Sequence, residues 1–140
     1  MNESLINQAE QLLTQCNVCT VASVSKQGYP RICVLMPIEA KGIKEFWFST
    51  GTNGTKVKHF ENSCKSGVTF YNGGDSVTIT GNMEIVTDKA TKDRLFDKRR
   101  DFLGRHLPNG GKEDPNYCIL HFSAKETTVY IDGKFETFEI

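Results

Sequence analysis

Hydroxyl, glycine and lysine residues follow one another over a short stretch whose chemistry suits an anion. Ser49 and Thr50 end an aromatic run at residues 46–48, and Thr55 and Lys56 follow after two glycines. A helix that begins at such a point presents backbone N–H groups and a partial positive charge, and a lysine adds a full charge. A phosphate monoester carries close to two negative charges at neutral pH, so neutral donors and two cations would match it.

Three interpretations of this stretch compete. A nucleotide P-loop is excluded, because that loop needs four residues between its glycines and a lysine directly after the second. Only two residues separate Gly51 from Gly54, and Thr55 precedes the lysine. An ordinary turn with solvated lysines is as compatible with the local sequence as a phosphate cradle. The phosphate interpretation requires that Arg31, from a neighbouring strand, meets Lys56 in space.

The cysteines do not form a metal or redox pattern. Five cysteines are an odd number without a regular framework, which favours a reduced intracellular setting. Cys16 and Cys19 form a C-x-x-C pair, but the histidines are scattered singly, so a zinc site lacks its other ligands. The pair also lies where a helix ends and a strand begins, unlike a thioredoxin motif. We expect partly buried free thiols and no metal.

Charge and hydropathy exclude two classes of partner. The chain has 17 basic and 17 acidic residues, which argues against a nucleic-acid binder that relies on phosphate neutralisation. No apolar stretch approaches the roughly 20 residues of a membrane span, and the N-terminus lacks the pattern of a signal peptide. We therefore expect a cytoplasmic protein without membrane contact. The 140 residues suffice for one core, so a single domain over residues 1–140 is expected.

The hydrophobic pattern predicts a mainly β framework for these residues. Helical spacing predicts helices at 5–16, 55–62 and 89–104, with N-caps at Ser4, Thr55 and Asp88. Alternation predicts strands at 18–24, 31–39, 44–49, 67–71, 76–86, 117–123, 127–131 and 135–140, with a bulge or strong bend at Gly81. Most links are too short for a parallel crossover, so we expect an antiparallel sheet that closes into a barrel with flanking helices.

The order of these segments resembles the pyridoxamine 5'-phosphate oxidase-like flavin proteins. The resemblance covers about residues 5–132, and it depends on the order and spacing of several motifs rather than on one. These are Arg31-Ile32-Cys33-Val34-Leu35-Met36, a strand ending Phe48-Ser49-Thr50, the pair Thr55-Lys56, and Ser76-Val77-Thr78-Ile79-Thr80-Gly81. Trp47-Phe48, Lys56 and the loop Gly110-Gly111-Lys112-Glu113-Asp114-Pro115 are most similar to the general stress protein branch.

The resemblance implies an FMN-binding split barrel, an antiparallel Greek-key barrel of six or more strands, which forms a homodimer with FMN at the subunit interface. Arg31 and Lys56 would hold the FMN phosphate. Lys58 and His59 are less important than Lys56 in this interpretation. Further cofactor contacts implied by position are the hydroxyls of Ser49, Thr50 and Thr55, the backbone of Ile32, Cys33 and Val34 along the isoalloxazine edge, and Ser76 from the partner subunit. The segment 102–111 would cover the flavin or the substrate side.

The function implied is that of an FMN-dependent oxidoreductase of unknown substrate, which uses a small molecule or a nicotinamide reductant. No catalytic residue is assigned, because the flavin carries the redox chemistry. Vitamin B6 oxidation is disfavoured, since Trp47 is the only tryptophan and no arginine follows Arg105. The alternatives are a non-catalytic flavin-binding or stress-response module, a deazaflavin binder, and a haem-binding relative with His106 or His121 as ligand.

Overall fold

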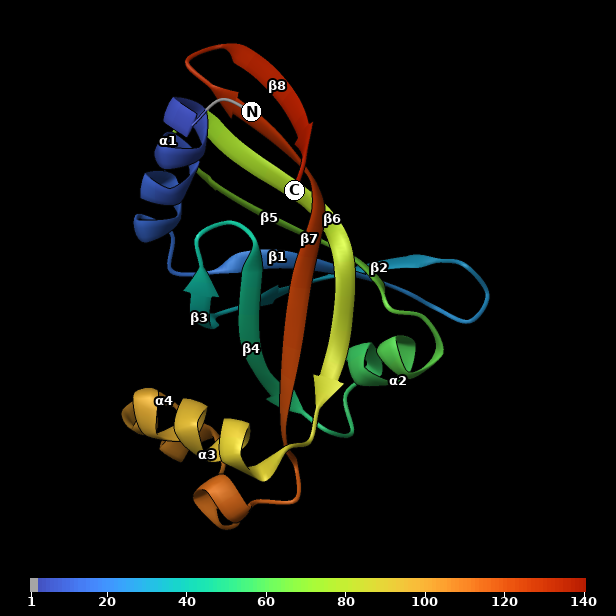
Figure 1. Ribbon diagram of the computed structural model, residues 1–140. Helices are drawn as coiled ribbons and strands as arrows, with labels where there is room; N and C mark the ends of the chain where they lie inside the picture. Colours follow the sequence, from blue (N-terminus) through green and yellow to red (C-terminus); the bar gives the residue numbers. More distant parts are fainter. Residues whose placement is uncertain (1–2) are drawn as a thin grey trace.

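One antiparallel sheet of eight strands dominates the molecule, with helices along its flanks (Figure 1). This computed structural model describes residues 3–140, apart from the side chain of Phe102. The helices are α1 (Glu3–Thr14), α2 (Thr55–Asn62), α3 (Lys89–Lys98), α4 (Arg100–His106) and the 3-10 helix η1 (Gly111–Glu113). The strands are β1 (Cys19–Val24), β2 (Pro30–Leu35), β3 (Pro37–Lys41), β4 (Glu45–Gly51), β5 (Lys65–Asn72), β6 (Asp75–Val86), β7 (Tyr117–Ile131) and β8 (Lys134–Glu139).

The strand order confirms the predicted split barrel. It runs β2-β1-β5-β6-β7-β4-β3, and β8 pairs with β7 beside this path. The long strands β6 and β7 extend through the molecule, with α1 and β8 at one end and α3 and α4 at the other (Figure 1). The two terminal strands of the order, β2 and β3, are consecutive in the chain. The sheet therefore curls so that its two edges approach one another across Met36.

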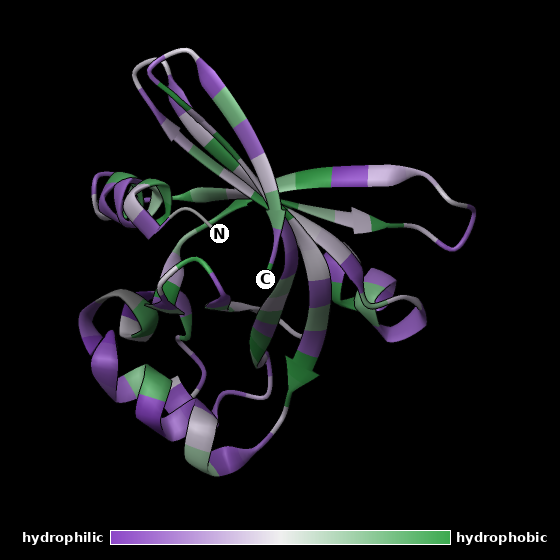
Figure 2. Ribbon diagram, turned by 45° about the horizontal axis from the view of Figure 1, so that its top comes forward, coloured by the Kyte–Doolittle hydropathy of each residue, from purple (hydrophilic) through white to green (hydrophobic). Residues whose placement is uncertain are grey.

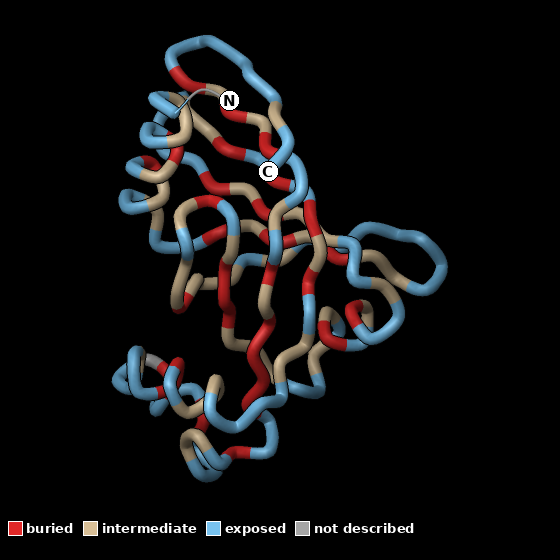
Figure 3. The backbone as a smooth tube through the Cα atoms, viewed as in Figure 1, coloured by how far each residue is buried: buried red, intermediate tan, exposed pale blue. Residues whose placement is uncertain are grey.

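Two clusters of buried side chains fill the fold, and β4 contributes to both. Phe46 and Phe48 are fully buried in the larger cluster and stack with 6.2 Å between ring centroids. Trp47, which points to the other face of the strand, lies in the smaller cluster with Leu95 and Phe96 of α3. Figure 3 shows the buried positions concentrated along β4 and β7. Helices α3 and α4 are largely hydrophilic in Figure 2, as expected for helices that bury only one face.

The predicted bulge at Gly81 is confirmed. The register between β6 and β7 shifts between Thr80 and Gly81. A Cβ atom at Gly81 would lie only 3.0 Å from Cα of Ala124, so this close approach of two strands requires glycine. The same shift lets β7 continue without a break, and the prediction of two separate strands at 117–123 and 127–131 is wrong.

Two further predicted elements are interrupted. The strand predicted at 31–39 divides at Met36, because Pro37 lacks an N–H group and the register with β4 shifts directly after it. The helix predicted at 89–104 divides at Arg99, whose φ of −128° and ψ of 43° are not helical.

Of the three predicted N-cap residues, one is correct. Asp88 caps α3 as predicted, and its carboxylate accepts a hydrogen bond of 2.9 Å from Thr91 N. Ser4 lies inside α1 rather than before it, and Gly54 takes the N-cap position that was predicted for Thr55. No helix in the described part of the chain has the length and hydrophobicity needed to cross a membrane.

Candidate functional site

The beginning of α2 brings Lys56 to the end of β4. Lys56 Nζ donates a hydrogen bond of 3.0 Å to Thr50 Oγ1. The chain reverses between them because Gly54 N donates to Gly51 O at 3.0 Å. A Cβ atom at Gly54 would lie 3.2 Å from that carbonyl oxygen and 3.9 Å from Nζ, so glycine keeps this turn tight. The lysine ammonium is thereby held beside a hydroxyl at the start of a helix.

Backbone donors lie at the same point. No side chain caps the N-terminus of α2, and the first bond of the helix is donated by Lys58 N to Gly54 O, at 3.4 Å. The amides of residues 55–57 precede this bond and have no acceptor within the helix. They carry the positive end of the helix dipole, which attracts negative charge. The site thus combines amides, a hydroxyl and an ammonium group.

Arg31 lies on the same side of the molecule as α2. Its register partner on β1 is Ser23, and Ser23 Oγ lies 2.8 Å from His59 Nδ1 of α2. Directly opposed residues of an antiparallel pair project to the same face. The exposed guanidinium of Arg31 has no hydrogen bond or ion pair to any residue that the structure describes. It is a cation with unused donors on the face that α2 covers.

Strand β2 also offers an open backbone edge. It is the terminal strand of the sheet order, so one of its sides is paired with β1 and the other presents N–H and C=O groups. Ile32 and Val34 are 69% and 63% exposed on its outer face, whereas Cys33 packs against the larger core cluster. Its free backbone edge fits the predicted contact with a ring edge.

Of the remaining predicted contacts, Thr55 lies beside Lys56, whereas Ser49 and Ser76 lie away from this point within one chain. By alternation Ser49 points to the opposite face of β4 from Thr50, and Thr55 is exposed at the start of α2. Ser76 lies near the β5–β6 turn, at the opposite end of these strands from α2, and pairs with Tyr71. Only a second copy of the chain could bring Ser76 to the phosphate end of another site. The binding roles of these three residues stay predictions.

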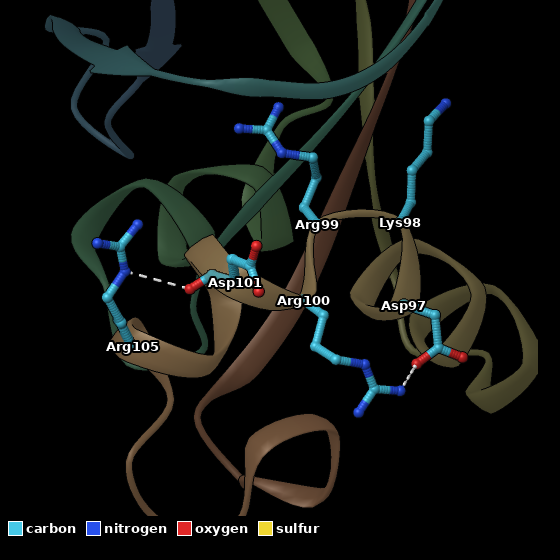
Figure 4. A pocket seen from close by; sticks show the side chains of 6 residues that line it. All are labelled: Asp97, Lys98, Arg99, Arg100, Asp101 and Arg105. Carbon is cyan, nitrogen blue, oxygen red and sulfur yellow. Dashed lines mark hydrogen bonds and ion pairs between the residues drawn. The ribbon is translucent and has the colours of Figure 1, made fainter.

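A cationic pocket at the junction of α3 and α4 was not found from the sequence. Its volume is about 360 Å³. It is lined by Asp97, Lys98, Arg99, Arg100, Asp101 and Arg105 (Figure 4). Arg100 pairs with Asp97, and Arg105 Nε donates to the Asp101 carbonyl at 3.2 Å. The sequence shows cations at 98–100 and at 105, but helical periodicity alone does not predict that their side chains line one pocket.

Glu39 attaches this helical segment to β3. Its carboxylate accepts hydrogen bonds from Arg94 at 2.8 Å and from Lys98 at 2.9 Å. The hydrogen bond from Arg94, with a further one from Lys98, lowers the pKa of Glu39. Arg99 also donates to the sulfur atom of Met36 at 3.1 Å. Met36, between β2 and β3, and Glu39 of β3 therefore contact the segment that forms the cationic pocket.

His121 is held by neighbouring side chains, and the cysteines are unpaired with one another. His121 Nε2 lies 2.8 Å from Glu45 Oε1, and its ring stacks on Trp47 with 4.5 Å between centroids. All five cysteines are free thiols. Burial raises the pKa of Cys19 to about 12 and also raises that of Cys16, so the C-x-x-C pair stays protonated at neutral pH. Within residues 3–140 no group of three or more His, Cys, Asp or Glu side chains is arranged to hold a metal.

Comparison with known proteins identifies the class. The family model described as Pyridoxamine 5'-phosphate oxidase matches residues 5–130, and the chain therefore belongs to this family. The curled antiparallel sheet with flanking helices agrees with its split-barrel neighbours. No curated protein matches the chain.

Solved structures place the chain close to the general stress proteins. A Clostridium acetobutylicum protein related to general stress protein 26 is 27% identical, with a TM-score of 0.87 over 100% of this chain and 97% of that one. General stress protein 26 of Bacillus anthracis is 18% identical, with a TM-score of 0.76 over 96% and 98% of the two chains. A heme binding protein from Mycobacterium smegmatis shares the fold at 12% identity and a TM-score of 0.76, covering 99% of this chain and 59% of that one.

Proposed function

We propose that this protein is an FMN-binding flavoprotein and an oxidoreductase of a small-molecule substrate, with a stress-related role in the cytoplasm. The observation that carries the proposal is the Lys56–Thr50 contact at the uncapped N-terminus of α2. Membership of the pyridoxamine 5'-phosphate oxidase family and the similarity to general stress protein 26 support it.

The phosphate of FMN fits the residues present. Its charge of nearly −2 would be met by Lys56 and Arg31, by the amides of α2 and by the Thr50 hydroxyl. The guanidinium of Arg31 has N–H donors that no described residue uses. Lys56 is already held in place by its hydrogen bond to Thr50. The open edge of β2 offers backbone groups to the polar atoms of the ring. Bound FMN would supply hydride or electron transfer, while these residues bind and orient it.

We further propose that two copies of the chain form the complete site. The outer face of the sheet carries a shallow apolar pocket of about 160 Å³, lined by residues of β1, β2, β5 and β6, including Ile32. Ile32, Val34, Tyr71 and Phe135 are each more than 60% exposed. Apolar surface of this kind is commonly a protein interface. A second copy packed there would cover β2 and could contribute its Ser76 to the site.

The cationic pocket between α3 and α4 suggests the substrate side. Lys98, Arg99, Arg100 and Arg105 outnumber the two aspartates that line it. Such a pocket would favour an anionic small molecule, and a nicotinamide dinucleotide reductant has this character. This proposal extends the prediction that the segment 102–111 covers the flavin or substrate side.

One set of spectra tests the proposal against its rivals. The purified protein should show flavin absorbance after incubation with FMN, and anaerobic NADH or NADPH should bleach it. Bleaching by neither reductant would favour a non-catalytic flavin-binding module. A Soret band on haem addition, in place of flavin binding, would favour the haem alternative. His121 is a poor candidate for that ligand, because it is engaged by Glu45 and Trp47.

A further inference from the structure

A buried serine on β1 contacts a histidine on α2. Ser23 is only 3% exposed, and its Oγ lies 2.8 Å from Nδ1 of His59. Throughout residues 3–140, Nδ1 is the only partner of this hydroxyl, and Nε2 of the same ring has none. The pair joins α2 to the sheet at the position where β1 is paired with Arg31.

The burial of Ser23 determines which ring nitrogen carries the proton. Burying a hydroxyl without an acceptor for its hydrogen costs the full desolvation free energy of that group. Donation from Ser23 Oγ to Nδ1 avoids that cost, and it requires Nδ1 to be the unprotonated nitrogen. The uncharged ring then carries its hydrogen on Nε2. His59 thus has an N–H donor that no described residue uses.

His59 lies on the same face of α2 as Lys56. His59 follows Lys56 by three residues, so the two side chains lie on neighbouring turns of one helix face. Val57 and Phe60 are buried beneath α2, and Lys58 is exposed on its other side. The ring contacts β1 directly opposite Arg31. It therefore lies between the helix turn that carries Lys56 and the strand that carries Arg31.

We propose that His59 is a phosphate-binding residue, which donates from Nε2–H to the phosphate of the bound flavin while Ser23 fixes its tautomer. The inference rests on the proposed function and adds a third side chain to Lys56 and Arg31. The serine acts through the histidine and is a positioning residue. Because the donor serves the phosphate alone, its loss should affect FMN and leave riboflavin, which has no phosphate, unchanged.

Binding of the two flavins to matched variants tests this. Dissociation constants for FMN and riboflavin would be measured by flavin fluorescence for the wild type, His59→Phe, His59→Gln and Ser23→Ala. His59→Phe should weaken FMN about tenfold, the size expected for a hydrogen bond to a charged group, with riboflavin unchanged. His59→Gln should recover part of the loss, because its amide N–H can replace Nε2–H. Lys58→Ala, on the exposed side of the same helix, should bind both flavins as the wild type does.

Equal weakening of both flavins, or no weakening, in His59→Phe would overturn the inference. If that variant does not fold, as judged by circular dichroism, Ser23→Ala decides, with a several-fold loss expected for FMN alone. Nitrogen-15 NMR of the wild-type ring gives an independent result, and a hydrogen on Nδ1 rather than Nε2 would contradict the assignment. A wild type that does not bind FMN refutes the proposed function. Normal wild-type binding with unchanged variants refutes only the role of His59.

Discussion

At the scale of single residues, the two lysines of α2 provide a matched comparison. Lys56 contacts Thr50 at the helix start, whereas Lys58 is exposed. Lys56→Ala removes a charge-assisted bond worth about 1.5–3 kcal/mol, so FMN binding should weaken by roughly one to two orders of magnitude. Lys58→Ala should change it little, and riboflavin should bind both variants alike. The measurement is a pair of fluorescence titrations, and equal effects of the two lysines would argue against a phosphate at the helix start.

The sequence suggested that Lys56 and Thr50 share one site, and the structure brings them into contact, while their phosphate-binding role stays a prediction. A lysine just after a glycine-rich turn has a chemical meaning that can be read locally, and the contact with Thr50 agrees with it. His59 received little weight, because its importance depends on Ser23, which is 36 residues away in the chain. Ser49 and Thr50 looked equivalent as adjacent hydroxyls, but strand alternation separates them onto two faces. In each case the local sequence lacks a tertiary contact or the direction in which a side chain points.

At the scale of elements, the docking of α3 on β3 should depend on pH. The pKa of Glu39 is lowered in the folded protein, first by its hydrogen bond from Arg94. A lowered folded pKa means that the stabilisation is present above the ordinary carboxyl pKa of about 4.3 and is lost as pH falls through the folded value. Glu39→Gln should reduce stability at neutral pH by about 0.2–1 kcal/mol, the range for accessible ion pairs.

Thermal unfolding at neutral pH and at about pH 3 would check the behaviour of Glu39. The melting temperatures of wild type and Glu39→Gln should differ at neutral pH and converge in acid. A difference that persists unchanged in acid would show that Glu39 does not act through its charge. The mutation should also loosen the cationic pocket, because Lys98 of its lining is held by the same carboxylate.

The elements themselves followed closely from hydrophobic periodicity, and the errors lie where the backbone departs from regular geometry. Strand alternation predicted β6 and its bulge, since Gly81 is a local signal. Arg99 gives no such signal, so the break between α3 and α4 was missed. Similarly, β7 spans residues 117–131 because it pairs with β4 and β8 in succession, which a local pattern cannot express.

At the scale of the whole molecule, the proposed FMN site needs two copies of the chain. The outer sheet face exposes Ile32 and Val34 next to an apolar pocket. A lysine in place of Ile32 would bury a charge at that interface in each copy, so Ile32→Lys should dissociate the dimer and weaken FMN together. Light scattering at micromolar concentration measures the mass. Gln11→Lys, which adds the same charge on exposed α1, should remain dimeric. A monomeric wild type would contradict the two-chain site.

The most direct test of the proposed FMN site is titration of the purified wild-type protein with FMN, followed by flavin fluorescence and by absorbance. Binding should be saturable at micromolar FMN or below, and tighter than that of riboflavin because of the proposed phosphate contacts at α2. No binding of FMN in this range, or equal affinity for FMN and riboflavin, would contradict it.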